Sequence, residues 1–122
     1  MAWYSAHLIT YFKLKNVSQN SFTVWENIVL IEAVDEAEAL IKAEEIGKRE
    51  AKLGAEDKSL TVDDKHAETV FAGVRKIGTV FHNGQDGKLE SGDEITFNEF
   101  AVADKQSIES LVRGEEVTVT LS

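Results

Sequence analysis

The alternation of apolar and polar residues predicts two strands at the start of the chain. From Trp3 to Leu14, apolar residues recur at nearly every second position, as on the buried face of a strand. Asn- and Ser-rich residues 16–21 predict a turn, and a second strand follows from Phe22 to Val34. Its middle, residues 28–31, is apolar on both faces. This predicts either a central strand covered on both sides or a strand covered by a partner.

A long helix is predicted over residues 35–53. Asp35 is placed to cap its first turn, and Glu38, three residues later, completes a capping-box pattern. Gly47 lies on the predicted inner stripe, where the lack of a side chain allows close approach to the sheet. Gly54 is predicted to end the helix as its C-terminal glycine.

The second half of the chain predicts three more strands and a short helix. After an acidic loop at 55–65, strands are expected at 68–81, 94–103 and 116–121, with a bulge near Asn98 and Glu99 and a hairpin connection at 82–93. Asp104 caps a helix at 104–113, which Gly114 ends and whose side chains Ile108, Leu111 and Val112 point inward.

These elements predict a single α+β domain over residues 1–122. Their order is β-β-α-β-β-α-β, and the simplest arrangement is an antiparallel sheet of about five strands with both helices packed on it. From the second strand onward, the order matches a split β-α-β pattern of ferredoxin-like type with one extra N-terminal strand.

Composition removes several classes of function. The net charge of −9 argues against binding to nucleic-acid phosphates. The absence of cysteine excludes disulfides, thiolate zinc sites and cysteine nucleophiles. The N-terminal residues lack a basic segment followed by a long apolar run, and no stretch approaches the roughly 20 apolar residues of a membrane span. We therefore expect a cytoplasmic protein that does not enter the membrane.

Three segments resemble a known family. They are the opening W-Y-S-A-H-L, the segment V-L-I-E-A-V-D-E-A-E-A-L-I-K-A-E-E-I-G-K and the later F-A-G-V. Together, over about residues 3 to 103, they resemble a family of small bacterial proteins catalogued only as a domain of unknown function. The resemblance implies an α+β domain and brings no activity, cofactor or catalytic residue.

Candidate metal or catalytic residues are few. The densest cluster is Asp63-Asp64-Lys65-His66, in a predicted loop where a solvated acidic turn is the ordinary explanation. No H-E-x-x-H or EF-hand spacing is present, and the glycines of residues 83–92 do not match a phosphate-binding loop. We therefore expect no metal, no cofactor and no assigned catalytic residue.

The second face of the first strand is the main candidate site. Half-polar aromatic residues such as those on this face are enriched at protein interfaces. The residues proposed for the interface are Trp3, His7, Ile9, Tyr11 and Trp25, with Val29 and Ile31 extending it if the two strands pair. The alternative is that helices of the same chain cover this face.

Two functions follow from these residues. The first is a non-enzymatic binding or protein-interaction module, acting as a homodimer and meeting a partner through the sheet face or a strand edge. The second is a small enzyme or ligand-binding protein with a pocket in which His7 or His82 acts as acid or base.

Overall fold

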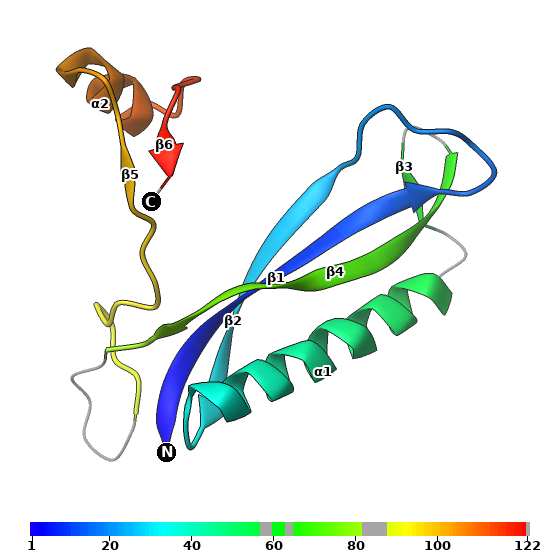
Figure 1. Cartoon of the computed structure of the whole chain (residues 1–122), viewed down its shortest axis with the longest axis horizontal. Coiled ribbons are helices and arrows are strands. Elements are labelled where there is room, and N and C mark those ends of the chain that lie inside the picture. Colours follow the sequence, from blue (N-terminus) through cyan, green and yellow to red (C-terminus); the bar gives the residue numbers. More distant parts are fainter. Residues whose placement is uncertain (57–59, 63–64, 82–87, 122) are drawn as a thin grey trace.

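The computed structural model describes residues 1–56, 60–62, 65–81 and 88–121. It confirms the predicted α+β class (Figure 1). The elements are β1 (Ala2–Leu14), β2 (Val24–Ala33), α1 (Glu36–Glu56), β3 (Thr61–Val62), β4 (Lys65–Thr79), β5 (Phe100–Ala101), α2 (Lys105–Val112) and β6 (Thr120–Leu121). No helix in these described ranges is long and apolar enough to cross a membrane.

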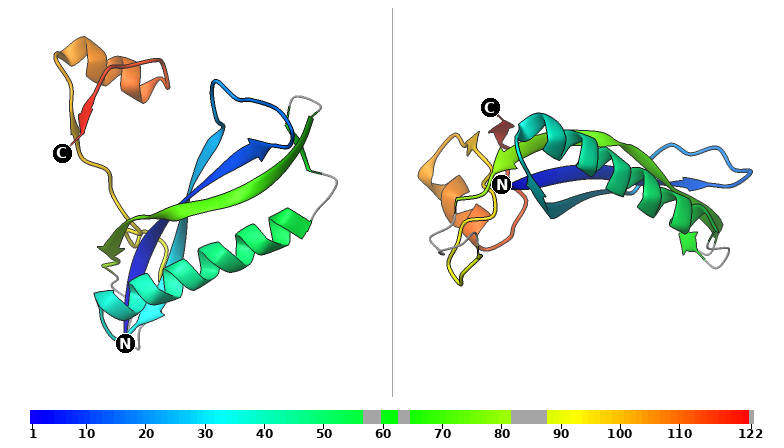
Figure 2. Two further views of the ribbon diagram at one scale, coloured as in Figure 1. Left: turned by 45° about the vertical axis from the view of Figure 1, so that its right-hand side comes forward. Right: turned by 90° about the horizontal axis from the view of Figure 1, so that it is seen from below.

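The main sheet contains four antiparallel strands in the order β2-β1-β4-β3, with α1 packed on one face (Figures 1 and 2). β2 therefore lies at an edge, and the prediction of a central strand was wrong. An apolar run predicts that both faces of a strand are buried. It does not predict how many neighbouring strands pair with it. The second possibility, cover by a partner, stays a prediction.

The long helix begins as its cap predicts. The Glu38 amide donates to Asp35 Oδ1 at 2.8 Å, and Glu38 Oε1 accepts from the Val34 amide at 3.3 Å. A Cβ at Gly47 would lie 2.3 Å from the Phe71 ring, so glycine is required for this close approach to β4. The prediction that Gly54 ends the helix was wrong, since α1 continues to Glu56. A Cβ at Gly54 would lie 2.8 Å from the Thr69 hydroxyl, so the glycine here allows close packing on β4.

The hydrophobic core is small. Nine hydrophobic side chains are buried among the described residues, and five of them are alanines: Ala6, Ala33, Ala39, Ala43 and Ala67. Leu8 is the largest side chain that is fully buried. Alanine removes little apolar area from water, so this core stabilises the sheet and helix less than an aliphatic core of equal count would.

The last fifth of the chain does not join the main sheet. We call residues 99–121 the arm. Among the described residues β5 and β6 pair only with each other, so the predicted strand 116–121 contributes two paired residues and the predicted strand 94–103 contributes these two and Glu94, which bridges to Phe81. The ferredoxin-like arrangement and the five-stranded sheet were therefore wrong. The main sheet reaches four strands because Thr61–Val62, within the predicted loop, pairs with β4.

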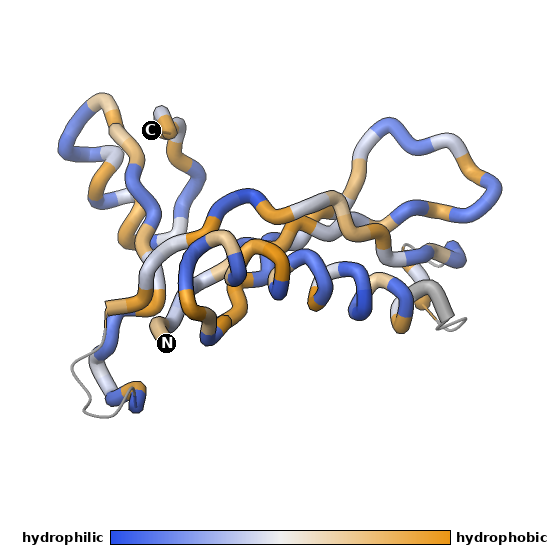
Figure 3. Tube along the Cα trace, turned by 60° about the horizontal axis from the view of Figure 1, so that its bottom comes forward, coloured by the Kyte–Doolittle hydropathy of each residue, from blue (hydrophilic) through white to orange (hydrophobic). Residues whose placement is uncertain are grey.

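α2 forms where predicted, but none of its side chains is buried. Asp104 caps it by accepting from the Ser107 amide at 2.8 Å, and Gly114 follows it with a φ of +75°. None of its apolar side chains is buried, so the inward orientation was wrong. Figure 3 shows the hydrophobic positions along this part of the chain. The exposed fractions are 51% for Ile108, 39% for Leu111 and 82% for Val112.

Candidate functional site

The pairing of β1 with β2 decides which side chains share the sheet face opposite α1, which we call the open face. Residues directly opposite in an antiparallel pair point to the same side. His7 pairs with Ile28 and Tyr11 pairs with Val24, so these four lie on the open face.

Trp25 does not belong to this surface. It pairs with Thr10, and its ring packs edge-on against Phe12 at 5.1 Å between centroids, on the side of the sheet that carries α1. Val29 and Ile31 share that side, because they pair with Ala6 and Tyr4. The expectation that these residues extend the open face was wrong. Val24, Ile28 and Leu30 extend it instead.

His7 is fully buried at the centre of a polar network on the open face. Its Nδ1 lies 2.7 Å from Glu26 Oε2, and its Nε2 lies 3.2 Å from Thr96 Oγ1. An ionised carboxylate can only accept, so Nδ1 donates to Glu26. Arg75 binds the same carboxylate at 3.1 Å. The network fastens the segment before the arm to β1 and β2, and it leaves His7 inaccessible to a partner.

Two bulges in β4 shape the open face. The register between β1 and β4 shifts between His7 and Leu8 and again between Ile9 and Thr10. Arg75 and Ala72 are the extra residues at these shifts. A bulge re-aims side chains that regular alternation would send to the other face. It brings Arg75 to Glu26 and Ala72 to the groove described next.

An apolar groove of about 460 Å³ crosses the open face at the far end from the His7 network. Tyr11 and Phe22 meet edge-on across it, with ring centroids 5.6 Å apart. Of the predicted interface residues, the structure therefore brings Ile9 and Tyr11 together here, leaves Trp3 near the start of β1, and buries His7. The lining residues are Ile9, Tyr11, Lys13, Phe22, Val24 and Ala72.

Comparison with family models assigns most of this chain to a family. The model of DUF4288, a domain of unknown function, matches residues 3–88. The chain belongs to this family. The matched residues hold the DUF4288 sheet and α1, and the match ends before the arm begins. Neither the curated proteins nor the solved structures contain a match to the chain.

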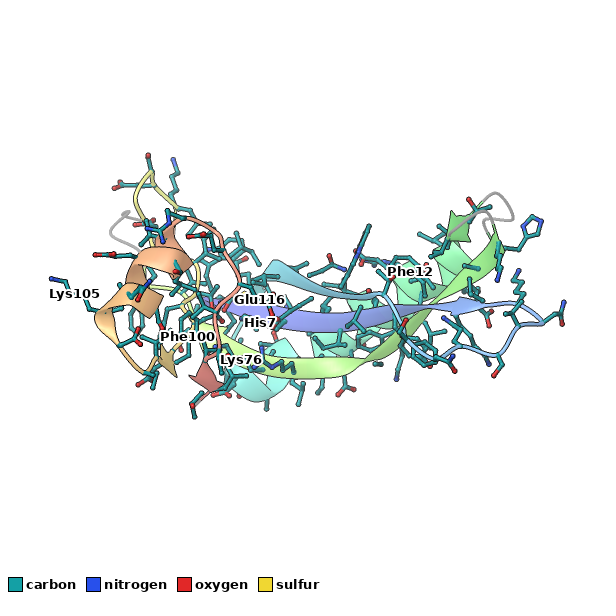
Figure 4. The ribbon with its side chains drawn as sticks, turned by 90° about the horizontal axis from the view of Figure 1, so that it is seen from above. His7, Phe12, Lys76, Phe100, Lys105 and Glu116 are labelled. Atoms are coloured by element: carbon teal, nitrogen blue, oxygen red, sulfur yellow. The ribbon has the colours of Figure 1, made fainter. Side chains whose placement is uncertain are left out.

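A second cavity, of about 430 Å³, lies between the DUF4288 sheet and the arm. Glu26 and Arg75 line one side, and Phe100 and Leu121 line the other. Lys76 reaches across, donating to the Phe97 carbonyl at 3.0 Å with its ammonium 5.6 Å from the ring centroid. His7 pairs with Lys76 across β1 and β4, and Phe100 lines the same cavity as Lys76, whereas Phe12 lies toward the other end of the sheet (Figure 4).

The predicted acidic metal cluster is only partly described. Asp63, Asp64 and His82 lie outside the described residues, and His66 is an exposed residue of β4 that pairs with Thr61. Within the part of the chain that the structure describes, no three His, Asp or Glu side chains come together as metal ligands.

The sequence interpretation missed Glu26, Arg75 and Thr96. Glu26 lies across the sheet from His7, and Thr96 lies 89 residues away along the chain. Alternation in β2 offers two possible faces for Glu26, and only the register with β1 chooses between them. A buried histidine needs polar partners, which was the one usable signal, but it names no particular residue.

Acid should weaken this DUF4288 core through Glu26. The hydrogen bond from His7, aided by Arg75, lowers the pKa of Glu26 below its ordinary value of 4.5, although partial burial opposes this. A lowered folded-state pKa contributes stability above the unfolded value that is lost as pH falls through the folded value. We expect the free energy of unfolding to fall more steeply for the wild type than for Glu26→Gln between about pH 6 and pH 3.

The measurement is urea unfolding at several pH values, with the exposed α1 substitution Glu44→Gln as the control. Glu44→Gln should keep the wild-type pH profile. A Glu26→Gln profile identical to that of the wild type would show that the His7 pairing does not stabilise the ionised carboxylate.

Proposed function

We propose that this protein is a non-enzymatic protein-interaction module that acts as a homodimer through the open face. The observation that carries the proposal is the size of its surface. The chain exposes 8854 Å². A compact monomer of 13.5 kDa exposes roughly 6,500 Å². The excess of roughly 2,300 Å² matches what one subunit of an obligate homodimer buries, between about 1,000 and 2,500 Å².

The chemistry of the excess surface supports the same function. Twenty large hydrophobic residues are exposed among the described residues, whereas the core is mostly alanine. On the open face, Val24 at the groove and Ile28 and Leu30 farther along β2 are 55%, 43% and 37% exposed. Exposed apolar side chains gathered on one face support a protein interface. Within the described residues β2 also lies at an edge of the sheet, which offers backbone donors and acceptors to a partner.

The solution mass tests the proposal. Light scattering over a range of concentrations should give twice the chain mass of 13.5 kDa. Val24→Glu should shift the protein toward monomer, because a charge in the apolar groove loses hydration when a partner covers it. Ile41→Glu is the matched control, since Ile41 is 58% exposed on α1, away from the open face. A wild type that stays monomeric at all concentrations would reject the proposal.

The cavity beside His7 favours a second candidate function, the binding of a small ligand. It combines Arg75 and Lys76 with the apolar Phe100 and Leu121, a mixture of anchoring charge and apolar lining that is typical of ligand sites. A fragment screen followed by NMR tests this function, with shifts at Lys76 and Phe100 expected on binding. Shifts confined to the distant groove would argue against it.

A further inference from the structure

The arm has too little structure to be stable by itself. α2 has eight residues, and β5 and β6 have two residues each. Isolated helices shorter than about 12 residues are marginal in water, and so is an isolated pair of strands. No described residue of α2 is buried. The arm meets the sheet of its own chain at the cavity that Phe100 and Leu121 share with Arg75, and this contact leaves the apolar face of α2 uncovered.

The groove at the other end of the open face has the size and chemistry to receive α2. It is apolar apart from Lys13, and its volume of about 460 Å³ accommodates several aliphatic side chains. Ile108, Leu111 and Val112 form the complementary apolar face on α2, following helical spacing.

The charges of the two surfaces are complementary. Residues 9–24, which border the groove, contain two lysines, Lys13 and Lys15, and no acid in a chain of net charge −9. The arm contains five acids and two bases: Glu99, Asp104, Glu109, Glu115 and Glu116, with Lys105 and Arg113. Within the described residues, neither lysine forms a salt bridge. The net charge of +2 on residues 9–24 and of −3 on the arm favours association of the two surfaces. It also favours the orientation in which the arm of one copy faces the groove of the other.

The two surfaces have separate positions in one chain, and their arrangement fits a pair of chains. The arm rises over the His7 end of the open face, and the groove lies at the opposite end (Figures 1 and 4). A two-fold axis between two open faces, perpendicular to their long direction, reverses one copy relative to the other. Each arm then lies over the groove of the other copy, as an isologous interface requires.

We infer that two copies of this chain exchange arms, with the apolar face of α2 from each copy seated in the Ile9, Tyr11, Phe22 and Val24 groove of the other. This inference rests on the proposed homodimer and specifies which surfaces meet. The arm lies outside residues 3–88, so arm exchange is a property of this chain beyond the matched DUF4288 region.

Cysteine crosslinking tests the exchange directly, because the chain contains no cysteine of its own. A Val24→Cys variant and a size-tagged Val112→Cys variant are mixed, equilibrated and treated with a short bis-maleimide. Both positions are exposed in the single chain, at 55% and 82%, so the substitutions leave the core intact. Arm exchange predicts that the mixed product between positions 24 and 112 forms in excess over both homodimeric products. Ile41→Cys replaces Val24→Cys as the control and should give no such excess.

The outcomes of the crosslinking experiment distinguish the arm exchange from the open-face dimer. A dominant product between two 24 positions, with a dimeric mass, would overturn the exchange and leave the open-face dimer standing. A monomeric mass without crosslinks would overturn both. As an independent measure, Leu111→Glu should raise the dimer dissociation constant roughly 10- to 100-fold, the loss expected for one buried aliphatic side chain. An unchanged dissociation constant with the fold intact would also reject the exchange.

Discussion

Leu8→Ala should lower the free energy of unfolding by about 3 kcal/mol, the largest effect we expect from a single truncation. Leu8 is fully buried between β2, β4 and α1, where its neighbours Ala6, Ala39 and Ala43 are too small to fill the space it leaves. The loss combines the transfer free energy of the removed methyl groups with that of the cavity. Urea unfolding monitored by circular dichroism at fixed protein concentration measures it.

Ile28→Ala is the matched truncation on the open face. Ile28 is 43% exposed in the single chain, so its removal there should lower stability by about 1 kcal/mol or less. In an open-face dimer the loss should instead grow with protein concentration, because the substitution weakens an association that stabilises the folded state. A Leu8→Ala loss no larger than the low-concentration Ile28→Ala loss would contradict the assignment of the core.

The local signals of the sequence predicted well because local chemistry decides them. The Asp35 and Asp104 caps each place a carboxylate three residues before an amide that it accepts from, and both helices begin there. Alternation in β1 identified Ala6, Leu8 and Phe12 as buried, since pleating alone sends every second side chain to one face. The close approach at Gly47 followed from the missing side chain on a buried helical stripe.

The long-range features were not predictable by the same means. The apolar pattern of α2 shows that Ile108 and Leu111 need cover, but a pattern cannot say whether the cover comes from the same chain. For the same reason the apolar middle of β2 suggested a central strand where the structure has an edge. Both errors have one physical origin, which is apolar surface that this chain does not bury for itself. The proposed second copy would cover both of these apolar surfaces.

His7→Leu should lower the free energy of unfolding by about 2 kcal/mol at neutral pH. The substitution keeps an apolar body of similar size in the fully buried position but removes both hydrogen bonds, to Glu26 at 2.7 Å and to Thr96 at 3.2 Å. It should also release the segment before the arm, which hydrogen exchange reports as faster exchange at residues 94–98. The proposed arm-exchanged dimer should weaken in parallel, because the segment before the arm is no longer fixed to the sheet.

A double-mutant cycle separates this fastening role from general damage to the core. Thr96→Val removes only the hydroxyl, so the coupling energy between His7→Leu and Thr96→Val should be about 1 kcal/mol. Additive losses would show that His7 and Thr96 act independently. A His7→Leu variant as stable as the wild type would mean that the buried imidazole does not hold the structure together, and it would shift weight to ligand binding in the adjoining cavity. The expected coupling would instead make His7 a positioning residue for the proposed arm exchange, because its hydrogen bond to Thr96 ties the segment before the arm to the sheet.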